Sequence, residues 1–101
     1  MIIYNVTINI EKSIHEEWLS WMKSSHIPSL METGLFKENR ILRVLGDEDS
    51  GGFTYSIQYS LENMDKYQQY LDIYAPKFRG EFNAKYKDKF VAFRTLLETI
   101  D

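Results

Sequence analysis

Residues 1–10 read MIIYNVTINI, and apolar and polar side chains alternate along them with a period of two. The apolar row consists of Tyr4, Val6, Ile8 and Ile10, and the polar row of Asn5, Thr7 and Asn9. Successive side chains of a β-strand point to opposite faces of its sheet. We therefore predict an opening strand with one buried face and one polar face.

The same alternation returns in FTYSIQYS (residues 53–60), where Phe53, Tyr55, Ile57 and Tyr59 share one face. Turn-forming residues 47–52 precede it. Before the turn, Ile41, Leu42, Val44 and Leu45 support a strand over 36–45, and the two strands together predict a hairpin. The final stretch FVAFRTLLETI (residues 90–100) is rich in β-forming residues and predicts a last strand that packs on both faces.

Two helical regions separate these strands. Ser13 and Glu16 have the spacing of a capping box, which predicts a helix from Ile14 with Ile14, Trp18, Trp21 and Met22 on its buried face. Pro28 predicts a kink, followed by a short helix over 29–33 that ends at Gly34. Aromatic and apolar residues at spacings of three and four predict a second helical region over 64–86, interrupted by Pro76 and Gly80.

The resulting order, β-α-β-β-α-β, predicts an α+β fold of the ferredoxin-like kind: one domain over residues 1–101, with a four-stranded antiparallel sheet and both helices on one face. The other face would then expose Ile3, Ile41, Leu45 and one row of the last strand beside polar side chains. Such a face is too apolar to remain in water, so we expect a second copy of the chain to cover it.

Composition excludes several classes of function. Fifteen acidic and twelve basic residues give a net charge of −3, which disfavours a nucleic-acid partner. The absence of cysteine excludes disulfides, thiol nucleophiles and cysteine-ligated metal centres. No signal peptide and no stretch of about 20 apolar residues is present, so we expect a cytoplasmic protein without a membrane partner.

Three short segments carry a resemblance to known proteins: His26-Ile27-Pro28, residues 33–36 (TGLF) and Phe93-Arg94-Thr95. With the element order, they resemble a bacterial family of proteins of about 100 residues and, more widely, the dimeric α+β-barrel superfamily. The resemblance implies a homodimer with a small-molecule cleft between the helices and the sheet of each subunit. That superfamily includes cofactor-free monooxygenases, haem-degrading enzymes, isomerases and regulatory ligand-binding domains, so membership does not select a chemistry.

His26 is the candidate catalytic residue, as a general acid or base beside the predicted kink, with Trp18 or Trp21 stacking on a flat ligand. The alternative is that His26 caps the helix end. His15 is eleven positions away, which excludes the i, i+4 spacing of a two-histidine metal site, and we expect no metal. Asn5, Trp21 and His26 match the residue types that cofactor-free oxygenases of this superfamily use, but Asn5 is expected on the opposite face of the sheet.

Arg43 and Arg94 lie within predicted strands, where a charged side chain requires water or an acceptor. Either arginine could bind a carboxylate or phosphate of a ligand; the alternative is a salt bridge to Glu38, Glu98 or the second copy. The face on which Arg94 lies is left open.

We therefore expect a homodimer that binds a small aromatic or anionic metabolite in a helix–sheet cleft, with Trp18, Trp21, Arg43 and Arg94 as candidate ligand-binding residues and with no cofactor. One alternative is a cofactor-free monooxygenase or isomerase that uses His26. The other is a protein-interaction module without a ligand, which would lack a pocket of the roughly 300 Å³ that metabolite sites typically have.

Overall fold

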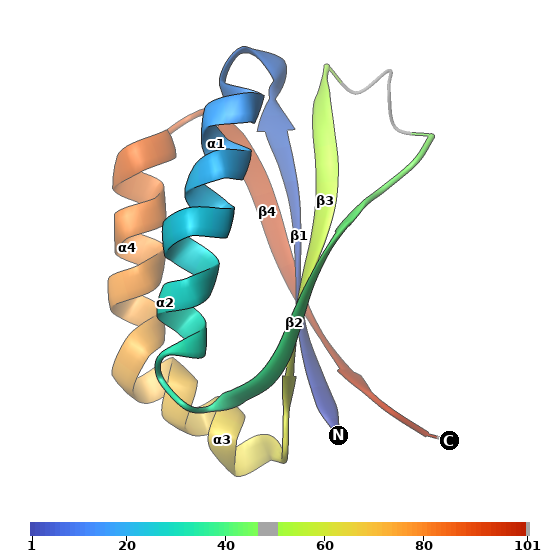
Figure 1. Ribbon diagram of the computed structural model, residues 1–101, viewed down its shortest axis with the longest axis vertical. Coiled ribbons are helices and arrows are strands. Elements are labelled where there is room, and N and C mark those ends of the chain that lie inside the picture. The colour runs from blue at the N-terminus through green and yellow to red at the C-terminus, as the bar shows by residue number, and fades with distance from the viewer. Residues whose placement is uncertain (47–50, 101) are drawn as a thin grey trace.

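The computed structural model describes residues 1–46 and 51–100 (Figure 1). Four strands and four α-helices follow one another in the predicted β-α-β-β-α-β order. They are β1 (Ile2–Glu11), α1 (His15–Trp21), α2 (Ile27–Met31), β2 (Phe36–Arg43), β3 (Gly52–Leu61), α3 (Met64–Gln69), α4 (Ala75–Tyr86) and β4 (Phe90–Glu98). Most of the turn predicted over 47–52 lies outside the described residues.

The strands form one antiparallel sheet in the order β2-β3-β1-β4, as the ferredoxin-like prediction requires. Tyr4 of the central strand β1 lies opposite Tyr59 of β3 and Leu96 of β4. All the helices lie on one side of the sheet, and the other side is open (Figure 1). No helix in the described residues is long and apolar enough to cross a membrane.

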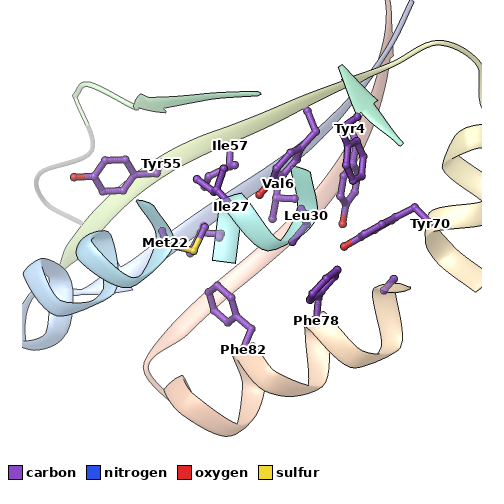
Figure 2. Packing of buried hydrophobic residues seen from close by; sticks show 14 of the residues in the cluster. Tyr4, Val6, Met22, Ile27, Leu30, Tyr55, Ile57, Tyr70, Phe78 and Phe82 are labelled. Carbon is purple, nitrogen blue, oxygen red and sulfur yellow. The ribbon is translucent and has the colours of Figure 1, made fainter. Parts of the chain in front are cut away.

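The core lies between the sheet and the helices (Figure 2). The predicted apolar row of β1 is buried, with Tyr4 and Ile8 each 2% exposed and Ile10 fully buried. Trp18 of α1 is also fully buried, and Phe78 and Phe82 of α4 point toward the sheet. Burial of each large apolar side chain stabilises the fold by about 1.5–3 kcal/mol. The packing of these side chains between the two layers therefore holds the helices on the sheet.

The first helical region begins differently from the prediction. A 3₁₀ turn, Lys12–Ile14, follows β1 directly, and α1 begins at His15 without a side-chain cap. The hydroxyl of Ser13 contacts the Glu11 carboxylate at 3.5 Å instead of capping α1. The predicted capping box is therefore wrong, because the 3₁₀ turn places Ser13 one residue too early in the chain to precede the first α-helical turn.

Both helical regions contain a π-helical turn, in which one turn holds an extra residue. The first, Met22–His26, joins α1 to α2, and Pro28 lies in the first turn of α2 directly after it. The disruption predicted at Pro28 thus takes the form of a wide turn that begins before the proline. The second, Tyr70–Tyr74, joins α3 to α4. The interruption predicted at Gly80 is wrong, since α4 continues through it.

Ile41 is predicted on the open face of the sheet, but it lies opposite Ile57 and packs against the core. The cause is a β-bulge between Phe36 and Glu38, which adds one residue to β2 and reverses the facing of every later side chain. Leu42 therefore takes the place on the open face that alternation alone assigns to Ile41.

β4 is an edge strand that pairs with β1 alone. The prediction that it packs on both faces does not hold within the chain, because Val91 and Phe93 on its open face are 70% and 60% exposed. Only Phe90 and Ala92, on the helix side, pack partly against the core. The described chain thus leaves an apolar surface at this edge.

Candidate functional site

A cavity of about 40 Å³ lies between the helices and the sheet, where the resemblance predicts a cleft. Its walls are mostly apolar, from Val6, Ile8, Met22, Leu30 and Ile57. Its polar lining comes from β1, the two π-helical turns, β3, α4 and β4: Tyr4, His26, Tyr59, Tyr70, Arg79, Asn83 and Arg94. The fold therefore brings chemically active side chains from six separate segments to one cavity.

Two arginines meet at the hydroxyl of Tyr4. Nη2 of Arg79, from α4, and Nε of Arg94, from β4, each donate to this oxygen over 3.1 Å. Arg94 lies opposite Val6 of β1, and so on the helix side of the sheet. Among the described residues, neither guanidinium has a carboxylate partner.

The Tyr4 hydroxyl also shares a hydrogen bond with Tyr70, and Figure 2 shows the two hydroxyl groups side by side. Burial and the nearby Tyr4 raise the pKa of Tyr70, so its hydroxyl keeps its proton at neutral pH. Burial alone would lower the pKa of Arg79, but the hydrogen bond to Tyr4 and the surrounding phenols outweigh it, and the net effect is a raised pKa. Arg79 is therefore positively charged in this network.

His26 ends the first π-helical turn and lines the cavity. Its ring stacks on Trp21, with centroids 4.9 Å apart, and meets the ring of Phe82 edge-on at 5.5 Å. Burial, followed by the positive charge of Arg94, lowers the pKa of His26 to about 4. The imidazole is neutral at pH 7 and makes no hydrogen bond within the described residues. It does not cap a helix end, because the helix continues into α2.

Of the residues predicted to bind a ligand, Arg94 lines the cavity together with the catalytic candidate His26. Trp18 is fully buried in the core against Tyr55, and Trp21 lies behind His26. Arg43 lies over the ring of Phe53 at 4.5 Å, outside the residues that line the cavity. The salt bridges offered as the alternative for both arginines are not formed among the described residues.

Asn5 lies on the open face, as predicted, where it donates to Thr7 and accepts from Ser56. The sheet therefore separates it from Trp21 and His26, and the oxygenase-like trio is not assembled. His15 forms a separate contact with the hydroxyl of Tyr55 at 2.6 Å. In the described part of the chain, no three histidine or acidic side chains gather as a metal site requires.

Sequence reasoning missed Arg79, Asn83, Tyr4 and Tyr70 as site residues. Arg79 and Asn83 follow the buried residues Phe78 and Phe82 directly and are four positions apart, so they share one flank of the buried stripe of α4. That spacing was a usable signal. Nothing in the sequence marks Tyr4 as a site residue, because a tyrosine in the buried row of a strand is most simply interpreted as part of the core.

Solved structures with this arrangement are numerous. The chain is similar to a dimeric ferredoxin-like protein from an uncultured marine organism, with a TM-score of 0.72, 13% identity, and coverage of 100% of this chain and 96% of that one. It is similar to an ethyl tert-butyl ether D (EthD) family protein from Bacillus halodurans, with a TM-score of 0.68, 14% identity, and coverage of 99% and 100%. An antibiotic biosynthesis monooxygenase matches with a TM-score of 0.65 and 9% identity over 100% of both chains.

At these identities the likeness defines the fold alone: an α+β protein of the ferredoxin-like kind. The model of the family described as "Domain of unknown function (DUF4286)" matches residues 1–100, and the chain belongs to that family. A search of curated proteins finds no match.

Proposed function

We propose that this protein is a homodimer that binds a small anionic metabolite in the cavity between its helices and its sheet. The observation that carries the proposal is the convergence of Arg79 and Arg94 on the Tyr4 hydroxyl, with no carboxylate partner among the described residues. Arg79 is half-buried, and taking a charged group partly out of water is costly unless a counter-charge is present. A bound anion supplies that counter-charge.

The homodimer is proposed from the open face of the sheet. Phe93 and Val91 are exposed there, and Leu42, at 39%, and Leu97, at 42%, extend the apolar area. Between them runs a hydrogen-bonded row in which Gln58 donates to Ser56 and Ser56 to Asn5. The ferredoxin-like relative from the marine organism is described as dimeric, which supports the same assembly here.

Native mass spectrometry of protein purified gently from its own host tests both parts of the proposal. We expect a dimer that carries a stoichiometric small acidic molecule. Arg94→Gln should release this molecule, whereas the matched variant Arg43→Gln, outside the cavity, should retain it. A wild-type dimer without an adduct, which also shows no thermal stabilisation by a library of organic anions, would contradict ligand binding.

A second candidate function is a cofactor-free monooxygenase or isomerase with His26 as general acid or base. It is favoured by the position of His26 in the cavity beside Arg94. The low pKa leaves the ring neutral and a weak base, whereas acid–base catalysis works best with a pKa near the ambient pH. Turnover of the bound molecule by wild type but not by His26→Gln would move this candidate to first place.

The third candidate, a protein-interaction module without a ligand, draws support from the size of the cavity. Its 40 Å³ is well below the roughly 300 Å³ of typical metabolite sites. Arg79 and Arg94, which have no carboxylate partner among the described residues, argue against this candidate. An interaction surface on the open face would not explain why two arginines converge on the helix side of the sheet.

A further inference from the structure

The polar end of the cavity has more hydrogen-bond donors than acceptors. The oxygen of Tyr4 has two lone pairs, and Arg79 and Arg94 donate to both. The hydrogen bond between Tyr4 and Tyr70 uses one of the two phenol protons. The other phenol proton has no acceptor within the described residues.

Arg79 adds a second unused donor. Its Nε is buried and has no hydrogen-bond partner in the described part of the chain. Each guanidinium carries five N–H groups, so both arginines keep further donors after bonding to Tyr4. An unsatisfied buried donor is costly, so the Nε of Arg79 calls for an acceptor that the described residues do not provide.

The size of the cavity limits that acceptor. A water molecule needs about 10–15 Å³ on the same scale, so 40 Å³ holds a group of three or four heavy atoms. Asn83 on α4 and Arg94 on β4 both line the cavity and are exposed. The cavity therefore reaches solvent between α4 and the edge strand, past the half-buried Phe90 and Ala92.

We infer that the cavity takes the carboxylate of a small monocarboxylic acid, held by Arg79, Arg94 and the Tyr70 hydroxyl, while its apolar body extends between α4 and β4 against Phe90 and Ala92. This inference rests on the proposed function and specifies its ligand. A planar carboxylate accepts from two guanidiniums at once. Phe90 and Ala92 are apolar, so a second charged group placed against them would have no partner.

Calorimetric titration with benzoate, benzamide and inorganic phosphate tests the inference. Benzoate and benzamide share their shape, but only benzoate brings a negative acceptor to the arginines. We expect benzoate to bind at least about tenfold more tightly than benzamide. Tyr70→Phe should weaken benzoate binding about tenfold, and Tyr67→Phe, which alters a ring beside Tyr4 outside the cavity lining, should leave it unchanged.

Three outcomes would overturn the inference. Equal affinity for benzoate and benzamide would show that the carboxylate is not recognised, while the proposal of a ligand-binding cavity would stand. Phosphate binding in place of benzoate would assign the arginines to a different anion. If benzoate does not bind, the inference fails, and the molecule copurified from the host decides separately whether the proposed function fails with it.

Discussion

Arg94 and His26 line the same cavity from the edge strand and from the π-helical turn opposite it, and the charge of Arg94 adds to burial in keeping the imidazole neutral. This pair suits an anion site. Arg94 can bind the negative charge of the ligand, and the uncharged ring of His26 can pack against its apolar part. The relationship also makes the stability of the fold sensitive to acid.

The pKa of His26 in the folded protein is about 4, against 6.5 as the ordinary value. Between these two values the unfolded chain binds a proton that the folded protein does not, so stability is lost as the pH falls from about 6.5 toward 4. The loss is at most about 3 kcal/mol and smaller because the ring is partly exposed. Urea unfolding of wild type and His26→Phe across this range measures it.

The difference between the two proteins isolates His26 from the carboxylates, which titrate in both. We expect the free energy of unfolding of wild type to fall more steeply than that of His26→Phe between pH 6.5 and 4. Parallel curves would show that His26 has an ordinary pKa in the folded state.

A carboxylate bound at Arg94 would cancel part of the positive field that lowers the pKa of His26. We therefore expect saturation with benzoate to raise this pKa, and binding near pH 5 to be accompanied by proton uptake. Imidazole chemical shifts followed by NMR, with and without benzoate, measure the change. The His15 ring, which bonds to Tyr55, is the internal control and should not move.

Two glycines give opposite predictions for the same substitution. A Cβ at Gly52 would lie 2.5 Å from the backbone oxygen of Ile10, so Gly52→Ala forces β1 and β3 apart and should cost about 1–3 kcal/mol. A Cβ at Gly80 meets nothing within 4 Å, and Gly80→Ala in the middle of α4 should stabilise by about 0.5–1 kcal/mol. Chemical denaturation compares the two variants; the same sign for both would contradict the close approach of β1 to β3 at Gly52.

The open face predicts how the proposed dimer can be broken. Phe93 is 60% exposed on this face, in the edge strand β4, so Phe93→Asp should abolish association without disturbing the core on the other face. Sedimentation velocity should show wild type as a dimer and the variant as a folded monomer. Ile73→Asp, at an exposed position on the second π-helical turn, is the matched control and should remain dimeric. Monomeric wild type would refute the assembly.

The strands could be predicted because their signal is local. Alternation along β1 and β3 identifies which row is buried, and the structure buries those rows. Ile41 shows the limit of this local signal. No residue pattern near it predicts the bulge after Phe36, and the one added residue turns every later side chain of β2 to the opposite face. The predicted start of the first helix was wrong for a similar reason. Ser13 is a suitable cap by residue type, but β1 continues to Glu11 and the 3₁₀ turn that follows it delays the start of α1 to His15.

Only some of the residues of the candidate site could be predicted from the sequence. His26 and Arg94 could be singled out because charged or titratable residues are unusual in apolar surroundings. The facing of Arg94 required its pairing with β1, and the role of Tyr4 required knowledge of which residues of α4 and β4 lie over it. Such a convergence of distant segments follows from tertiary packing, which periodicity does not record.

The π-helical turns have a further consequence for how the chain can change in length. Each holds one residue more than an α-helical turn, and Met22, His26 and Tyr70, which line the cavity, all belong to these turns. Deleting that extra residue from either turn would leave an ordinary α-helical turn, so the rest of the helix could keep its facing and Leu30 its burial, while the cavity-lining residues of the turn itself would be displaced. Insertions and deletions are normally tolerated in loops; here two helical turns could also accommodate the loss of one residue, with the cavity lining as the part that changes.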